Sequence, residues 1–240
     1  MLKKLEIMQN IDNAEKRKFD DLGHDWWNAR GNFRPLHEIN PARIAYINTH
    51  AGLNGKTVID VGCGGGILAE AMTRMNASVT GIDISEESLQ CARHHGLQAG
   101  LAIHYAACSP EDFAAKMAHQ YDVVTCMELL EHVPDPFSVV AACTQLARPG
   151  GHVIFSTINR TVKSYLLGIL GAGYLLKLLP AGTHHYAKFI RPSELASWSR
   201  HAGLEVLDIT GIRYIPFLHR AELTADTGIN YLLHARLPGH

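Results

Sequence analysis

An acidic residue followed by alternating glycines carries the clearest chemical signal in the sequence. A mostly apolar run over residues 57–61 predicts a buried strand, and Asp60 lies near its end. The glycines follow directly, in residues 60–66 (DVGCGGG). Glycine has no Cβ, so such a turn can be tight and its backbone can approach a ligand closely. A helix predicted over residues 67–75 adds unpaired N–H groups and partial positive charge at its N-terminus. The stretch therefore predicts a site for a nucleotide or a nucleotide-like molecule.

Two ligands compete for this turn. Residues 64–69 fit G-x-G-x-x-A, a pattern used for dinucleotides, so an NAD-dependent oxidoreductase is one alternative. Asp60 would repel a pyrophosphate but suits an ammonium or sulfonium group, and S-adenosylmethionine (SAM) carries both. Asp83, at the end of a strand predicted over 78–83, follows Gly62 by about 20 residues, the spacing of an acid that holds ribose hydroxyls. We expect SAM, bound by Asp60, Gly62, Gly64 and Asp83.

Two carboxylates and an imidazole follow the fourth predicted strand, over residues 121–127. In a helical turn, Glu128, Glu131 and His132 occupy positions i, i+3 and i+4, which share one face. Such a set can bind a divalent cation such as Mg²⁺, or His132 can act as a general base. A purely structural histidine is the remaining alternative. We expect Glu131 and His132 to lie beside the substrate as catalytic residues.

The predicted elements that must position these residues alternate between strand and helix. This alternation predicts an α/β, Rossmann-like fold with a seven-stranded, mostly parallel sheet and helices on both faces. In such sheets ligands bind at the carboxyl ends of the strands, where the glycine turn and the acids lie. No helix precedes the last strand, so we expect it to be antiparallel. The predicted strands span 57–61, 78–83, 103–106, 121–127, 152–157, 204–209 and 229–236, and the helices after them 67–75, 85–95, 136–147 and 192–202.

The segment before the first strand, residues 1–56, predicts a helical cap. One helix is expected over 12–22 and a second over 41–50, the latter with Asn40 as N-cap and proline at its first position. Arg43 would then lie in the first turn, where the helix dipole disfavours a cation. This placement suggests an anionic partner such as the carboxylate of SAM, with a local salt bridge as the alternative.

The most apolar stretch, residues 165–179 (YLLGILGAGYLLKLL), contains one charge, Lys177. It is shorter than the roughly 20 residues that a spanning helix needs. It can form buried core, line an apolar substrate, or anchor the chain to a membrane surface, where Lys163 and Lys188 would meet anionic headgroups. We expect a lid insertion over 161–190 that serves both the substrate and the membrane. A non-catalytic membrane scaffold would need only this stretch, and it is a second alternative function.

The composition describes a single domain, residues 1–240. Lys and Arg (22) nearly balance Asp and Glu (23), so no overall field favours nucleic acid. Five cysteines without a C-x-x-C pair indicate reduced thiols in a cytosolic protein. The charged N-terminus lacks the apolar core of a signal peptide. We therefore expect a cytoplasmic protein that associates peripherally with a membrane.

The glycine turn with Asp83 resembles the cofactor site of class I SAM-dependent methyltransferases. Over nearly the whole chain, further motifs resemble the family of O-methyltransferases of ubiquinone biosynthesis. These motifs are Trp26-Trp27 and the stretches 33–37, 39–43, 60–66, 126–135, 156–160, 182–184 and 188–190.

This resemblance implies the methylation of ring hydroxyls on polyprenylated phenols or catechols, namely 2-polyprenyl-6-hydroxyphenol and 3-demethylubiquinol. It also implies that Arg43, Gly62, Asp83 and Met127 contact SAM. Glu128, Glu131 and His132 would hold Mg²⁺ or another divalent cation where the family uses one. Other enzymes of ubiquinone biosynthesis would be the protein partners.

Overall fold

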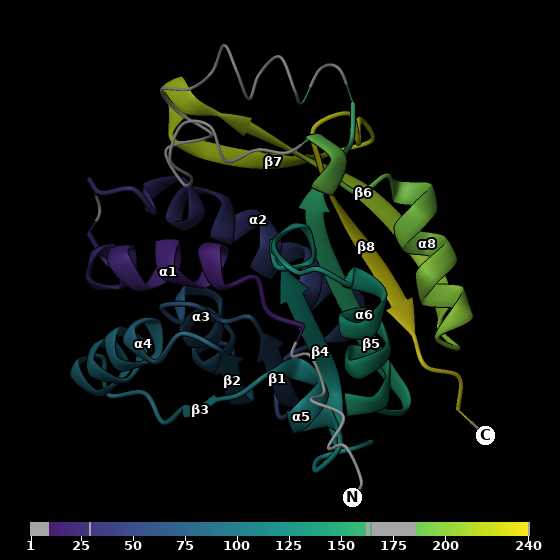
Figure 1. Ribbon diagram of the computed structural model, residues 1–240, viewed down its shortest axis with the longest axis horizontal. Helices are drawn as coiled ribbons and strands as arrows, with labels where there is room; N and C mark the ends of the chain where they lie inside the picture. Colours follow the sequence, from purple (N-terminus) through teal and green to yellow (C-terminus); the bar gives the residue numbers. More distant parts are fainter. Residues whose placement is uncertain (1–9, 29, 162–163, 165–185, 240) are drawn as a thin grey trace, which may run out of the picture.

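The structure, a computed structural model, describes residues 10–28, 30–161, 164 and 186–239. A central β-sheet is covered by helices on both faces (Figure 1). Its strands are β1 (Thr57–Val61), β2 (Ser78–Asp83), β3 (His104–Ala107), β4 (Tyr121–Met127), β5 (Ala147–Ile158), β6 (Glu205–Ile215), β7 (Arg220–Thr224) and β8 (Asn230–Arg236). Their order across the sheet is β3-β2-β1-β4-β5-β8-β6-β7. The α/β fold expected from the alternation of strands and helices is confirmed.

Parallel pairing brings the ligand-binding ends of the first strands together. β1 pairs in parallel with both β2 and β4, so Val61 lies between Ile82 and Cys126. β8 is antiparallel to β5 and to β6, which confirms the expected direction of the last strand. The residues that follow β1, β2 and β4 therefore meet at one edge of the sheet.

The prediction of seven strands is wrong, because β7 adds an eighth strand at the sheet edge. β6 continues to Ile215 rather than ending near residue 209, and β7 folds back antiparallel to it. The strand sequence, RAELT, has neither the continuous apolar run nor the strict alternation by which buried strands are recognised. Such an edge strand is held by its hydrogen bonds and by packing on α2 (Arg34–Ala51), neither of which its local pattern reports.

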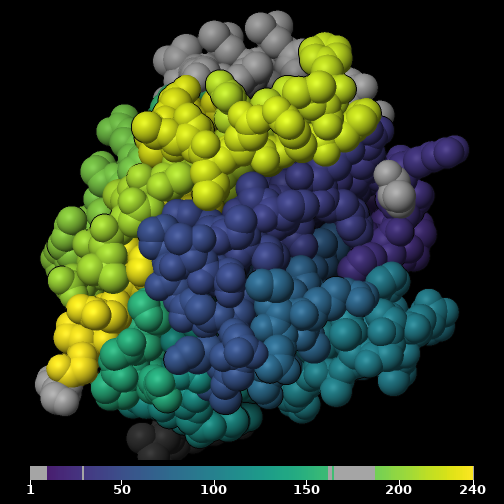
Figure 2. Space-filling model, turned by 180° about the vertical axis from the view of Figure 1, so that it is seen from behind, coloured from purple at the N-terminus to yellow at the C-terminus, as the bar shows by residue number. Residues whose placement is uncertain are grey.

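The helices divide between the two faces of the sheet. Adjacent strand residues point to opposite faces, so Val123 joins the core beneath one helical layer and Val124 the core beneath the other. This two-sided burial explains why the inner strands are mostly apolar. One layer contains α2, α3 (Ile67–Arg74) and α4 (Glu86–Gln98), and the other contains α5 (Pro110–Ala114), α6 (Pro136–Leu146) and α8 (Pro192–His201). Figure 2 shows the first layer, with the β6–β7 hairpin crossing above it.

Helix α2 begins seven residues earlier than predicted, at Arg34 instead of Pro41. Pro35 occupies the first turn, and Pro41 lies inside the helix on an exposed position. The buried face of the helix, which includes Tyr46 and Ile47, supplies packing that offsets the hydrogen bond lost at Pro41. Arg43 consequently lies well inside the helix, and the argument from the helix dipole does not apply to it.

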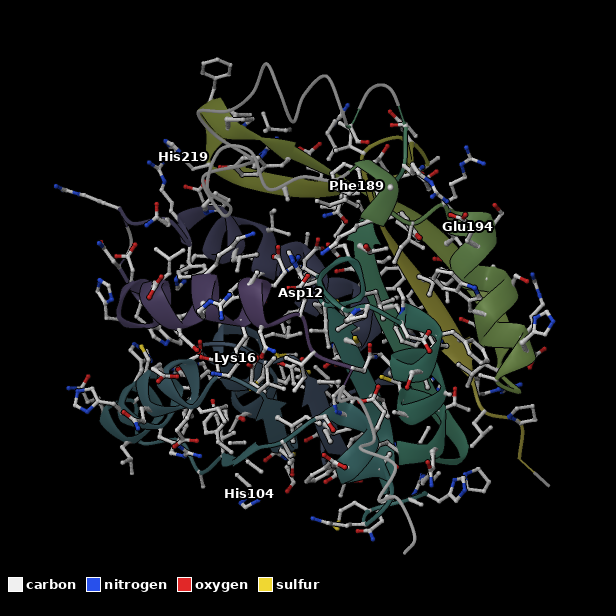
Figure 3. The ribbon with its side chains drawn as sticks, viewed as in Figure 1. Asp12, Lys16, His104, Phe189, Glu194 and His219 are labelled. Carbon is white, nitrogen blue, oxygen red and sulfur yellow. The ribbon has the colours of Figure 1, made fainter. Side chains whose placement is uncertain are left out.

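The N-terminal segment forms α1 (Asn13–Leu22), which is followed by a short 3-10 helix over Gly23–Asp25. Asp12 caps α1 by accepting hydrogen bonds from two backbone N–H groups, and Lys188 lies 3.0 Å from its other oxygen. Trp26, Phe33 and Ile67 form a third, smaller core with residues of α1. Asp12 lies near the centre of the molecule in Figure 3. Further 3-10 helices span Leu130–His132, Tyr186–Lys188 and Pro216–Leu218.

Residues 165–179, and with them most of the expected lid over 161–190, lie outside the described residues. Within the part of the chain that the structure describes, no helix has the length and apolar character needed to cross a membrane.

Buried His234, which lies beside the partly buried His152, should make the fold sensitive to acid. Nδ1 of His152 and Nε2 of His234 lie 2.9 Å apart, and the ring of His50 packs against His234 at 4.9 Å. Burial, followed by the charges of these two neighbours, lowers the pKa of His234 to about 4. The unfolded chain binds this proton near pH 6.5, so it holds more protons than the folded state between the two values. Stability should therefore fall as the pH drops from about 6.5 to 4, by at most about 3 kcal/mol from His234.

Urea denaturation at a series of pH values measures this effect. His234→Gln should flatten the dependence in that interval, whereas His104→Asn, on exposed edge strand β3, should leave it unchanged. An equally steep dependence in the His234 variant would contradict the assignment.

Candidate active site

A cavity opens at the carboxyl ends of β1, β2 and β4 beneath the N-terminal segment. Its volume is about 1300 Å³, counted with its open mouth. α1 closes one side through Glu15, Lys16 and Phe19. The structure brings every site residue expected from the sequence to its wall: Arg43, Asp60, Gly62, Gly64, Asp83, Met127, Glu128, Glu131 and His132.

The glycine turn is shaped by what lies against it. Gly64 has a φ of +51°, in the left-handed region that side chains disfavour, and its N–H donates to Asp83 Oδ2 at 2.9 Å. A Cβ on Gly64 or Gly65 would lie within 2.4 Å of the Trp26 ring. Trp27 Nε1 donates to the carbonyl of Gly65 at 2.8 Å. The two tryptophans thus hold the turn from the side of the N-terminal segment, and only glycine leaves room for them.

Asp83 ends β2 with both carboxylate oxygens facing backbone donors. Oδ1 accepts from the N–H of Ser85 at 2.9 Å, and Oδ2 accepts from Gly64. Burial raises the pKa of Asp83, opposed by these hydrogen bonds. A carboxylate offers about four acceptor positions, so it can still accept hydrogen bonds from the hydroxyls of a ribose in the cavity.

Replacing Asp83 by asparagine should raise the Kd for SAM roughly 10- to 100-fold, the scale of a hydrogen bond to a charged acceptor. Isothermal titration calorimetry measures the change directly. Glu86→Gln, which neutralises an exposed acid in the first turn of α4, is the matched control and should keep the wild-type Kd. A folded Asp83 variant with unchanged affinity would exclude the ribose role.

Asp60 and Arg43 give another part of the cavity wall a mixed charge. Asp60 is buried at 2% exposure, accepts from Thr125 Oγ1 at 2.7 Å, and has its pKa raised to about 7 by burial. Among the described residues, neither Arg43 Nε nor Asn40 Oδ1 has a hydrogen-bond partner, although both atoms are buried. Buried polar groups are normally paired. A free donor and a free acceptor at one wall match the carboxylate and ammonium of the methionine half of SAM, so these residues fit that cofactor.

Glu128 forms an ion pair with Arg43, and it does not share a helical face with Glu131 and His132. Its Oε1 accepts from Arg43 Nη2 at 2.8 Å, from Ser156 Oγ at 2.7 Å and from Asn230 Nδ2 at 3.1 Å. Burial opposes ionisation, but Arg43 and these hydrogen bonds keep the pKa of Glu128 below its usual value.

The prediction that three side chains converge on one helical face is wrong. Glu128 has a φ of +53° and only Leu130–His132 is helical, as a 3-10 turn. Thr157 Oγ1 donates to Glu131 at 2.7 Å, and His132 Nδ1 lies 3.0 Å from Glu15. Within the described residues, no group of three or more His, Cys, Asp or Glu side chains could hold a metal ion. As arranged, these three residues do not fit a divalent cation.

Glu131 takes up a proton more readily than an ordinary glutamic acid in this arrangement. Burial and then the negative charge of Glu128 raise the pKa of Glu131 well above its ordinary value, while the hydrogen bond from Thr157 opposes the shift. Two close buried carboxylates hold a single charge more easily than two. In its protonated form Glu131 can donate a hydrogen bond into the cavity.

Sequence reasoning missed three residues of this site: Glu15, Trp26 as a wall of the glycine turn, and Asn40. Asn40 was assigned to a helix cap, but its Nδ2 donates to the carbonyl of Ile67 at 3.2 Å. Glu15 lies in a helix with many charged residues, and no local sequence pattern distinguishes it from the solvent-exposed charged residues beside it. Only contacts far along the chain identify these roles.

Known proteins share this architecture. Residues 33–209 match a family model described as a methyltransferase domain. A magnesium protoporphyrin IX methyltransferase from Synechocystis PCC 6803, solved with bound SAH, has the same fold (TM-score 0.66, 18% identity, 93% of each chain). So does a SAM-dependent methyltransferase from Thermotoga maritima (TM-score 0.67, 14% identity, 92% of this chain and 99% of that one). The fold and the family match define a class I SAM-dependent methyltransferase.

Nearer relatives narrow this class. Ubiquinone biosynthesis O-methyltransferases from Thiobacillus denitrificans and Aromatoleum aromaticum are each 56% identical, over 95% of this chain and 99% and 97% of theirs. The enzyme of the same name from Pseudomonas aeruginosa is 53% identical over 95% of this chain. This chain belongs to the ubiquinone biosynthesis O-methyltransferase family, as its motifs predicted. The relatives support neither an NAD-dependent oxidoreductase nor a non-catalytic scaffold.

Proposed function

We propose that the protein methylates ring hydroxyls of 2-polyprenyl-6-hydroxyphenol and of 3-demethylubiquinol. The observation that carries this proposal is the position of His132, an imidazole in the wall of the cavity that also holds the expected SAM residues. A base at that point can activate a hydroxyl next to the methyl donor. The family membership supports the choice of a polyprenylated phenol or catechol.

The cofactor half of the cavity would be organised from the chain as follows. Arg43 and Asn40 would bind the methionine end of SAM. Asp60 would balance the positive charge of SAM, and Asp83 would accept hydrogen bonds from the ribose hydroxyls. Gly62, Gly64 and Met127 would contribute backbone and van der Waals contacts. Bound SAM supplies a methyl group on a sulfonium centre and leaves as S-adenosylhomocysteine.

The substrate half would prepare the attacking oxygen. A phenolic hydroxyl has a pKa near 10 by analogy with tyrosine, so it must lose its proton to become a good nucleophile. His132 would take that proton, and Glu131 in its protonated form would donate a hydrogen bond to orient an oxygen of the substrate. Holding the oxygen in line with the methyl group and excluding water contribute much of the rate in such sites.

Dependence on a divalent cation would need Glu128, Glu131 and His132 to rearrange, because Arg43, Thr157 and Glu15 respectively now hold their side chains. No step above uses a cation. Activity measured after thorough chelation and after addition of Mg²⁺ decides whether such a rearrangement takes place.

For residues 165–179 we propose a lid at the membrane surface, based on sequence alone. Its apolar residues suit the substrate's prenyl chain, and basic residues beside them suit anionic lipid, at about 1 kcal/mol each. With residues 1–56 as a cap, the single domain over 1–240 would work peripherally, near other enzymes of the pathway. Co-sedimentation with neutral and anionic liposomes tests this proposal. Equal recovery of the protein with both kinds of liposome would exclude a contribution of the basic residues to membrane binding.

A radiolabelled methyl-transfer assay tests the proposed function. Short-prenyl analogues of both substrates should accept the label, and the same ring without its prenyl group should accept it less efficiently. Absence of transfer to either analogue by a chain that binds SAM would overturn the proposal.

A further inference from the structure

Helix α1 contacts the proposed base directly. Oε2 of Glu15 lies 3.0 Å from Nδ1 of His132, across 117 residues of sequence. Glu15 is 8% exposed, which is unusual for a carboxylate on a short helix near the chain terminus. A buried carboxylate needs a partner, and here the partner is the imidazole.

This contact determines which ring nitrogen carries a proton. An ionised carboxylate only accepts hydrogen bonds, so Nδ1 must be the donor and neutral His132 must have its lone pair on Nε2. Among the described residues, Nε2 makes no hydrogen bond, and the ring lines the cavity. The proton-accepting nitrogen is therefore the one left for a substrate hydroxyl.

Other residues of α1 fix the geometry of the pair. Lys18 Nζ lies 2.6 Å from Oε1 of Glu15, so each carboxylate oxygen has a partner. The Phe19 ring meets the imidazole edge-on, with centroids 5.3 Å apart and planes at 88°. The hydrogen bond from His132, which is opposed by burial and reinforced by Lys18, lowers the pKa of Glu15 to about 2. Glu15 thus stays ionised throughout the range in which His132 would work.

We propose that Glu15 is a positioning residue for His132: it holds the imidazole in the Nδ1–H form and turns Nε2 toward the substrate hydroxyl. The inference rests on the proposed role of His132 as base. The chemistry is that of a carboxylate–histidine pair, in which the acid orients the ring and stabilises its protonated form without itself taking up the proton. Helix α1 would thus complete the active site as well as cover it.

The test compares Glu15→Ala and Glu15→Gln with Asp21→Asn, an exposed acid on the same helix. Glu15→Ala should lower kcat roughly 10- to 100-fold, the scale for removing an outer carboxylate from an imidazole, with the Kd for SAM unchanged. Glu15→Gln, whose amide oxygen still accepts from Nδ1, should recover part of kcat. Asp21→Asn should match the wild type.

Nitrogen-15 NMR of labelled histidine separates positioning from a general structural effect. The wild-type His132 signals should show the Nδ1–H form, Glu15→Gln should retain it, and Glu15→Ala should show a mixture of both neutral forms. Wild-type kcat in the alanine variant, or an unaltered Nδ1–H signature, would overturn the inference. If His132→Ala itself retained full activity, the base role would fail, while the NMR result would still decide whether Glu15 orients the ring.

Discussion

Replacing His132 by alanine should lower kcat by roughly 10²- to 10⁴-fold, the usual contribution of a positioned general base. The Kd for SAM should change little, because His132 lies in the proposed substrate half of the cavity and Asp83 in the cofactor half. Steady-state methyl transfer together with calorimetry measures both quantities on one preparation. Added imidazole should restore part of the rate, since a small base can enter the space that the side chain leaves.

The alanine variant also leaves Glu15 without its partner, so a second variant is needed. His132→Gln keeps a donor within reach of Glu15 but cannot act as a base at neutral pH, and it should lose as much kcat as alanine. His104→Ala is the matched control, since His104 is exposed at the sheet edge far from Asp12 and the N-terminal cap (Figure 3). A folded His132→Gln enzyme with wild-type kcat would exclude His132 as the base.

Replacing Arg43 by methionine should destabilise the fold by about 3–5 kcal/mol, the cost of removing one partner of a buried ion pair. Arg43 has a side-chain exposure of 6%, and Glu128 would keep only neutral donors from Ser156 and Asn230. The pKa of Glu128 would then rise toward that of a buried acid. SAM affinity should fall as well, because the free Nε of Arg43 is lost from the cavity.

A double variant separates these two effects. Combining Arg43→Met with Glu128→Gln removes the unpaired charge, so most of the stability should return in urea denaturation, whereas SAM affinity should stay low. The coupling between the two substitutions is the measure of the ion pair. If Arg43→Met alone unfolded at the wild-type urea concentration, the pair would contribute nothing to the fold.

The parts of the fold predicted from the sequence are those with local signals. β1 and β4 are predictable because burial on both faces favours strands made mostly of apolar residues. α4 is predictable because Ser85 caps it, accepting from the N–H of Ser88 at 3.1 Å. The sequence did not predict β7, and it predicted the start of α2 at the wrong residue. Their stability comes from pairing and packing with distant segments, which outweighs the usual preference against proline inside a helix.

The residues of the candidate site also fall into a group that the sequence predicts and a group that it does not. Residues at strand ends, such as Asp60 and Asp83, were predicted because the α/β topology fixes where those ends meet. Glu15 and Asn40 act across the fold, so their sequence neighbourhood says nothing about them. Glu128, Glu131 and His132 do not share the predicted helical face, because Glu128 takes a left-handed conformation where the prediction requires regular helix.

The position of the transferred methyl group tests most directly whether the protein methylates a ring hydroxyl. The protein is incubated with SAM carrying a deuterated methyl group and a short-prenyl catechol, and mass spectrometry with NMR locates the label. An O-methyltransferase should place the label on a ring oxygen, with one S-adenosylhomocysteine formed per methoxy product. Label on a ring carbon, or S-adenosylhomocysteine formed without a methylated ring, would contradict it.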